Sequence, residues 1–340
     1  MKALFIGGSG TISAAIVRRL SEELNWDVYL LNRGNRDLGD LKNVTQITAD
    51  INDEEDVLEK LGDETFDVVS EFIGFTVDAV ERDYRLFKDR TKQYIFISSA
   101  SVYNKPAADY VITEGTTLAN PYWEYSRNKI ACEEFLMEKY RKEGFPVTIV
   151  RPSHTYDERS IPLGVHGKNG SFQVIKRMLE GKPVIIHGDG TSLWTLTFNE
   201  DFAVGYTALM GNSHAYGEAF QITGDETLTW NQIYQTIADA LGVELNAYHI
   251  SSEYLSEVGD KFGFDFEGSL VGDKAVSVVF DNSKLKRIAP EMKTYIPFSE
   301  GVRITLDYVL SHEECQIEDP VFDSWCDRVI VALENAKLSV

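Results

Sequence analysis

Tyr125 and Lys129 stand four positions apart in a segment whose pattern predicts a helix. This spacing puts the two side chains on one helical face. A lysine ammonium in that place favours the phenolate and lowers the pKa of the tyrosine. Tyr125 could then accept a proton from a substrate hydroxyl while a hydride leaves for an oxidised nicotinamide. The pair therefore predicts an enzyme that acts on an alcohol or a ketone.

Hydroxyl side chains follow a predicted buried strand at residues 94–98, upstream of this pair. Ser98, Ser99 and Ser101 come at its carboxyl end. The carboxyl ends of strands form the crevice in which α/β sheets bind ligands. We expect Ser99 to hydrogen-bond the reacting oxygen and Ser101 to contact the substrate, although any one of these serines could instead cap a turn.

A glycine-rich turn at residues 7–13 directly follows the apolar run at residues 3–6. Gly7 and Gly10 allow a tight turn and let the backbone approach a pyrophosphate, and the following helix offers free N–H groups and a partial positive charge. Ser13 stands where a third glycine would let helix and strand pack closely. We expect the pyrophosphate contacts to come from five residues, Gly7, Ser9, Gly10, Thr11 and Ile12.

The end of the second predicted strand bears on the choice of cofactor. An acid there would bind the ribose 2′-hydroxyl of NAD, but this chain has Asn32 and Arg33. A guanidinium suits a 2′-phosphate, so the sequence favours NADP over NAD. Alternatively, Arg33 is solvated and Asp37 or Asp40 binds the ribose. Asp50, followed by Ile51, ends the third strand and could either bind the adenine amine or cap the next turn.

Short apolar runs alternate with helix-like segments through the first half of the chain, which predicts a parallel sheet covered on both faces. We expect an α/β fold: a Rossmann-type doubly wound parallel sheet with a smaller, partly interleaved C-terminal domain. Residues 1–160 would form the cofactor domain, with parts of 184–225 returning to it, and residues 161–340 mainly the α+β substrate domain. The expected strands are 3–6, 28–31, 45–48, 68–72, 94–98, 147–150, 183–187, 219–223 and 275–280. The expected helices are 12–24, 54–61, 76–87, 125–143, 200–210, 230–241 and 299–311, while 251–270 reads as irregular.

Bulk composition narrows the class of protein. The chain has 340 residues, 43% of them hydrophobic, and a net charge of −21, which argues against nucleic-acid and membrane partners. Three scattered cysteines fit a reducing compartment without disulfides. No run reaches the ~18 apolar residues of a membrane span, and the start leaves no room for a signal peptide, so we expect a cytoplasmic protein. The six histidines have no metal-ligand spacing, so no metal is expected.

These motifs resemble the extended short-chain dehydrogenase/reductases, the NAD-dependent epimerase/dehydratase family, in an atypical bacterial branch also similar to chloroplast stem-loop-binding proteins. The resemblance covers most of the chain, including residues 151–156, 198–203 and 220–223. It implies that Tyr125 is the catalytic base, Lys129 its partner and ribose contact, and Ser99 the orienting hydroxyl. It further implies cofactor contacts from Phe72, Ile73, Gly74, Ser98 and Pro152, a sugar-like or polyol substrate near Ser101, His154 and Trp194, and a homodimer formed through the helices at 76–87 and 125–143.

Several departures from the family pattern leave the substrate and the reaction open. His154 replaces the usual Asn, and Leu193-Trp194 replace an Arg that often binds a diphosphate, which weakens the case for a nucleotide sugar. His154 could contact substrate or be structural. Glu71 could be a second acid or could accept backbone N–H bonds. The net reaction could be epimerisation, dehydration or redox, and the rival class is a non-catalytic dinucleotide sensor or RNA-associated protein.

Overall fold

A seven-stranded parallel sheet forms the centre of the computed structural model, which describes residues 1–34 and 38–339. Asp37, one of the alternative ribose ligands, lies outside the described residues. The strand order is β12-β7-β5-β4-β1-β2-β3, as expected for a doubly wound Rossmann-type fold. The strands are β1 (Lys2–Ile6), β2 (Asp27–Asn32), β3 (Val44–Thr48), β4 (Val68–Glu71), β5 (Tyr94–Ile97), β7 (Val147–Pro152) and β12 (Glu218–Ile222).

Helices cover both faces of this sheet, so that every residue of the central strands β4 and β5 is buried. On one face, α1 (Ser13–Glu22) and α6 (Asn199–Leu209) pack together through residues such as Ile16, Leu20 and Tyr206. On the other face lie α2 (Glu54–Leu61), α3 (Val77–Phe87) and α4 (Glu124–Glu143), whose buried side chains include Val57, Leu86 and Leu136. The sheet and its covering helices thus include α6 and β12, two elements that come late in the chain.

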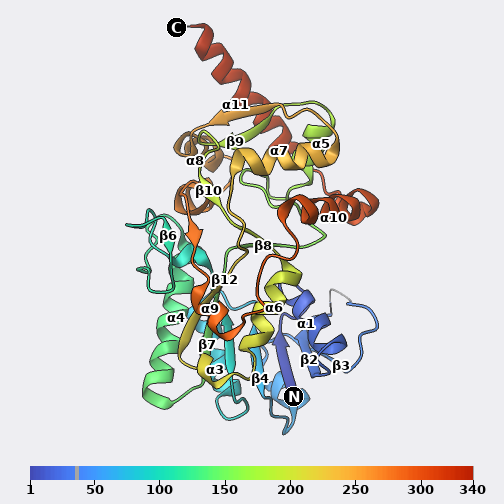
Figure 1. Cartoon of the computed structure of the whole chain (residues 1–340), viewed down its shortest axis with the longest axis vertical. Helices are drawn as coiled ribbons and strands as arrows, with labels where there is room; N and C mark the ends of the chain where they lie inside the picture. The colour runs from blue at the N-terminus through green and yellow to red at the C-terminus, as the bar shows by residue number, and fades with distance from the viewer. Residues whose placement is uncertain (35–37, 340) are drawn as a thin grey trace.

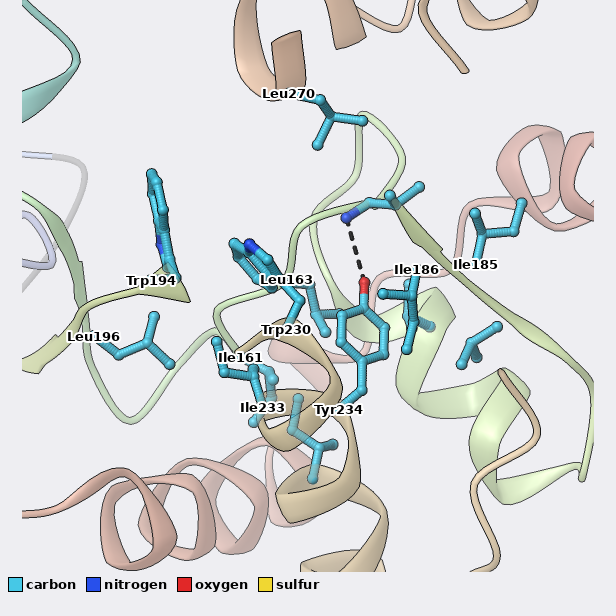
Figure 2. Packing of buried hydrophobic residues seen from close by; sticks show 14 of the residues in the cluster. Ile161, Leu163, Ile185, Ile186, Trp194, Leu196, Trp230, Ile233, Tyr234 and Leu270 are labelled. Atoms are coloured by element: carbon cyan, nitrogen blue, oxygen red, sulfur yellow. Dashed lines mark hydrogen bonds between the residues drawn. The ribbon is translucent and has the colours of Figure 1, made fainter. Parts of the chain in front are cut away.

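A second hydrophobic cluster occupies the other end of the molecule (Figure 1). Trp230, Ile233 and Tyr234 of α7 lie at its centre, and the Tyr234 hydroxyl accepts a hydrogen bond from the Val165 N–H at 3.3 Å (Figure 2). Its helices are α5 (Phe172–Leu179), α7 (Trp230–Leu241), α8 (Ser252–Asp260), α10 (Phe298–Ser311) and α11 (Pro320–Leu338). Its parallel pair is β9 (Val184–His187) with β14 (Ala247–Ile250).

Short strand pairs connect the two ends of the molecule. β8 (His154–Tyr156) pairs with β11 (Leu196–Phe198), and β10 (Leu193–Trp194) pairs with β13 (Leu228–Thr229). β6 (Val111–Ile112) pairs with β15 (Val279–Phe280), and the short helix α9 (Ser283–Ile288) follows. These pairs border the crevice at the carboxyl end of the large sheet.

The structure differs from the sequence expectation mainly in the second half. Residues 251–270, expected to be irregular, contain helix α8, which begins where the Ser251 side chain accepts a hydrogen bond from the Tyr254 N–H. A π-helical turn, Glu267–Lys274, follows. The expected strand at 275–280 shortens to Val279–Phe280. Helices α5, α9 and α11 were not expected.

The described residues add three general facts. None of their helices is both long enough and apolar enough to cross a bilayer. All three cysteines are free, with Cys132 and Cys326 buried. In the part of the chain that the structure describes, no group of three or more His, Cys, Asp or Glu side chains is arranged to hold a metal ion.

Candidate active site

The glycine-rich turn lies between β1 and α1 and is closely packed. Gly7 has a φ of +82°, and a Cβ there would come within 2.5 Å of Ile73. Only glycine therefore fits that position. The Ser13 hydroxyl donates to the Gly7 carbonyl at 2.8 Å and accepts from the Gly10 N–H at 2.9 Å. Ser13 thus cross-links the turn, a role that a third glycine could not have.

The start of α1 faces the same crevice. Asn199 of α6 donates to the Thr11 carbonyl at 3.0 Å, which fixes the last residues of the turn. Ser9, Thr11 and Ile12 stay partly exposed, and Gly10 is exposed. The first N–H groups of a helix have no carbonyl partner within the helix. These features are compatible with the pyrophosphate site that the sequence predicts, which stays a prediction.

Arg33 and Asp50 lie at one edge of this crevice, after β2 and β3. Arg33 is exposed, and the Asn32 amide oxygen accepts from the Gly34 N–H at 2.8 Å. Asp50 accepts two hydrogen bonds from Asn52, each 3.0 Å, so it caps the turn. The backbone bond from Asn52, and to a lesser degree the charge of Arg33, lowers the pKa of Asp50. Ile51 is buried beside it.

The segment after β4 forms the next wall. The Phe72 ring packs between Phe5 and Tyr206, with centroid distances of 5.8 and 5.7 Å, so its side chain belongs to the core. Ile73 is 44% exposed and lies against Gly7. Glu71 is fully buried and accepts a hydrogen bond from the Ile73 N–H. Of the two roles considered for Glu71, the structure thus has it accept a backbone N–H.

Lys129 is anchored beneath this wall. Its side chain is 1% exposed, and its ammonium donates to the carbonyls of Gly74 and Ile97, both at 2.7 Å. These bonds account for two of its three N–H donors. The ammonium lies 5.9 Å from the centroid of the Tyr125 ring. Burial lowers the pKa of Lys129 to about 8.

The pKa of Tyr125 differs from the sequence expectation. Burial raises the pKa of its phenol above the ordinary value, and a hydrogen bond with Ser99 opposes this rise. The prediction that Lys129 lowers the pKa of Tyr125 is therefore wrong for the protein without a bound cofactor. The free-energy cost of removing a phenolate from water outweighs its attraction to the Lys129 ammonium at this distance.

A chain of hydroxyls leads away from Tyr125. Ser99 and Ser101 hydroxyls are 2.9 Å apart, and Ser126 of α4 donates to Ser101 at 2.7 Å. The Ser99 hydroxyl also accepts from the Ser101 N–H at 3.1 Å. This network orients Ser99 beside the phenol. Ser98 is buried, and its hydroxyl has no partner among the described residues.

Tyr125 and Ser99 open into a cavity of about 300 Å³. Trp123, Pro152, His154 and Trp194 form other parts of its wall, and Ser101 lines it as well. The Trp194 indole donates to Nδ1 of His154 at 3.2 Å, and burial lowers the pKa of His154 well below its ordinary value. His154 is therefore a neutral wall residue, and the structure brings all three expected substrate residues into one cavity.

Sequence reasoning missed three charged residues of this cavity: Lys105, Asp273 and Lys274. No motif or spacing in the chain marks them, because Lys105 lies in a loop and the other two lie in the π-helical turn. It also missed Asn120, whose amide donates to the Ser101 and Gly272 carbonyls at 2.9 and 2.7 Å. An Asn just before a predicted helix is a recognisable capping signal.

The fold and the site define a dinucleotide-dependent enzyme of the short-chain dehydrogenase/reductase type, with a glycine-rich turn after β1 and a Ser–Tyr–Lys group at the crevice. More narrowly, the chain belongs to the NAD dependent epimerase/dehydratase family, whose model matches residues 3–223.

Similarity to individual proteins is more distant. The chain is 23% identical to 2′-dehydrokanamycin reductase of Streptomyces kanamyceticus, covering 85% of this chain and 79% of that protein. It is 26% identical to chloroplast stem-loop binding protein of 41 kDa b of Arabidopsis thaliana, covering 71% and 63%. The structure of dTDP-glucose 4,6-dehydratase from Bacillus anthracis in complex with NAD superimposes with a TM-score of 0.72 at 19% identity, covering 92% and 98%. The last likeness concerns the fold.

Proposed function

We propose that the protein transfers a hydride between NAD(P) and a secondary alcohol or ketone carbon of a sugar-like or polyol substrate. The observation that carries this proposal is the meeting of Ser99 and Tyr125 at one cavity, with the Lys129 ammonium 5.9 Å from the centroid of the Tyr125 ring. When bound, the nicotinamide supplies or accepts the hydride. Tyr125 takes the hydroxyl proton on oxidation and returns it on reduction.

The other two residues prepare this proton transfer. Ser99, held by Ser101, donates to the reacting oxygen and fixes its distance from the phenol. Lys129 has one N–H donor beyond its two carbonyl partners, and this donor suits a ribose hydroxyl. Its charge, together with that of the oxidised cofactor, would offset the burial that raises the pKa of Tyr125.

NADP is the favoured cofactor, with NAD as the alternative. Arg33 is exposed at the end of β2, where its guanidinium can pair with a 2′-phosphate. Asp50, which follows β3, accepts both of its hydrogen bonds from Asn52 through one carboxylate oxygen.

The net reaction follows from what happens to the cofactor. If the cofactor is retained and regenerated, the net reaction is epimerisation or dehydration. If the cofactor is released, the net reaction is oxidation or reduction. Glu71 is fully buried and is not among the residues that line the cavity, which argues against it as the extra acid of a dehydratase. The similarity to 2′-dehydrokanamycin reductase supports simple reduction as much as epimerisation.

A non-catalytic, RNA-associated role is the rival function, and the stem-loop binding relative is the observation in its favour. The net charge of −21 and the assembled Ser99, Tyr125 and Lys129 argue against it. Filter binding with a structured RNA at low salt separates the two: salt-sensitive micromolar binding would support the rival.

We further propose a cytoplasmic homodimer. The three free thiols fit a reducing compartment. Helices α3 and α4 pack side by side and could pair with their copies across a two-fold axis. Light scattering at micromolar concentration should give twice the mass of one chain, and a monomer mass would contradict this.

The proposed function is tested by cofactor binding and turnover together. Calorimetry should detect NADP(H) binding to the purified enzyme, and a panel of neutral, acidic and amino sugars should reveal cofactor reduction with at least one member. Absence of NADP(H) and NAD(H) binding would contradict the proposal.

A further inference from the structure

The cavity beside Tyr125 contains two lysines, although the whole chain has a net charge of −21. Lys105 comes from the loop after Tyr103, and Lys274 ends the π-helical turn. Among the described residues that line the cavity, Asp273 is the one carboxylate. Such π-helical turns are rare and are often found at functional sites.

Lys105 is held firmly at this wall. It is 4% exposed, its ammonium lies 3.2 Å from a carboxylate oxygen of Asp273, and it lies 5.8 Å from the centroid of the Trp194 ring. A buried ammonium is costly unless it is paired. Asp273 therefore neutralises Lys105.

Among the described residues, no carboxylate forms such an ion pair with Lys274. Its carbonyl is fixed by donors from His187, Ser192 and Trp230, so its position in the wall is well defined. Among residues 1–34 and 38–339, its ammonium has one hydrogen-bond partner, the Ser269 carbonyl at 3.4 Å. Two of its three N–H donors remain for a ligand.

The charges around Lys274 act on it from a distance: those of Asp273 and Asp265 favour its ammonium form, against the burial that lowers its pKa. Asp265 is nearby, but its two oxygens accept from the Trp123 indole and the Gly268 N–H, each at 2.9 Å, and it does not line the cavity. His154 is neutral. Two ammonium groups and one carboxylate in the wall give an excess of one positive charge, and a group with a single negative charge would balance it.

The cavity is small, and one residue of its wall, Trp194, is tightly packed. Trp194 packs against Trp230 with ring centroids 5.6 Å apart, and both belong to the second hydrophobic cluster (Figure 2). Its volume of about 300 Å³ is at the lower limit for small-molecule sites. This space suits one sugar ring better than a nucleotide sugar.

We propose that the substrate is a single sugar-like unit with a carboxylate, which Lys274 binds with help from Lys105 while its hydroxyl or ketone faces Tyr125 and Ser99. This inference rests on the proposed function, because it assigns the substrate class of the same site. The single negative charge of a carboxylate matches the excess of one positive charge in the cavity wall, which favours a carboxylate over a doubly charged phosphate.

Calorimetry with the NADPH-saturated enzyme, in which an alcohol cannot be oxidised, tests this proposal. The probes are glucuronate, glucose, glucosamine and glucose 6-phosphate, which share a ring but differ in charge. We expect glucuronate to bind at least tenfold more tightly than glucose. Lys274→Met should remove that preference without changing NADPH affinity, and Lys142→Met, on the exposed face of α4, should retain it.

Other results would overturn the proposal. Equal binding of glucose or glucosamine, tighter binding of glucose 6-phosphate, or an unchanged preference in Lys274→Met would each do so. If NADPH binds but none of the four probes does, the carboxylate inference is wrong and the proposed function stands. If NADPH itself does not bind, the proposed function is wrong and this inference with it. The ranking of the four probes is measured on the wild type, so this part of the test does not depend on whether a variant folds.

Discussion

Arg151 on β7 and Glu133 on α4 form a buried bidentate ion pair, with Nε–Oε1 and Nη2–Oε2 distances of 2.9 and 2.5 Å. Arg151 also donates to the Tyr103 hydroxyl at 3.3 Å. The pair joins the helix that carries Tyr125 and Lys129 to the strand that ends beside the cavity. It therefore positions the proposed catalytic residues although it does not touch the cavity.

Glu133→Ala should destabilise the protein by about 3 kcal/mol, because removal of one partner leaves a buried guanidinium without its carboxylate. Denaturant unfolding measures the loss. Glu134→Ala, at the exposed neighbouring position, is the matched control and should change stability by less than about 0.5 kcal/mol. Equal effects of the two variants would show that the pair does not stabilise α4.

Ser13→Ala should loosen the glycine-rich turn. It removes the hydroxyl that joins the Gly7 carbonyl to the Gly10 N–H, and each lost hydrogen bond costs about 1 kcal/mol. We expect a lower free energy of unfolding and severalfold weaker NADP(H) binding by calorimetry. Ser324→Ala, at an exposed position of α11, should change neither. Unchanged cofactor affinity in Ser13→Ala would mean that the cross-link does not shape the phosphate site.

Arg33→Ala should selectively weaken the binding of NADP. We expect the wild type to prefer NADP over NAD at least tenfold, or about 1.4 kcal/mol, and the variant to lose that preference. Lys42→Ala removes an exposed cation near the same sheet edge and serves as the control. A wild type that prefers NAD would show that Arg33 does not select the cofactor.

The buried Lys129 predicts a rise of stability with pH. The folded pKa is about 8 and the ordinary value is 10.5, so between these values the unfolded chain binds a proton that the folded chain does not. The free energy of unfolding should therefore increase from pH 8 to 10.5, by at most about 3 kcal/mol from this group. Lys129→Met should flatten this rise relative to the exposed Lys142→Met. Parallel pH profiles of the two variants would contradict the lowered pKa.

Local sequence signals predicted most of the sheet layer. The strand β1, the turn with Gly7 and helices α2 and α7 follow from continuous apolar runs, glycine and helical periodicity. Helix α11 was not predicted, although Asp319 caps it and Pro320 is its first residue. No strand alternates with it in the sequence, and it packs against α5, which is distant along the chain. Helix α8 was missed because its acidic residues and the nearby glycines and phenylalanines suggested an irregular segment.

The candidate site could be predicted where its residues lie in one segment of the sequence. It could not be predicted where the fold brings residues from distant segments together. Tyr125 and Lys129 share one helical face, so their spacing identified them. Lys105 and Asp273 meet only through the fold, across 168 positions. The pKa of Tyr125 could not be read from spacing either, because it depends on how deeply the side chain is buried.

The central claim, that Tyr125 transfers the proton in hydride exchange, is tested most directly by deuterium transfer. Wild-type enzyme and Tyr125→Phe are each incubated with NADPH deuterated at the transferable position and a panel of keto sugars, and mass spectrometry follows the label. We predict label in at least one sugar product with the wild type, and a rate lower by about 100-fold or more in Tyr125→Phe at unchanged NADPH affinity. Equal rates in both proteins, or no transfer by a wild type that binds NADPH, would contradict the account.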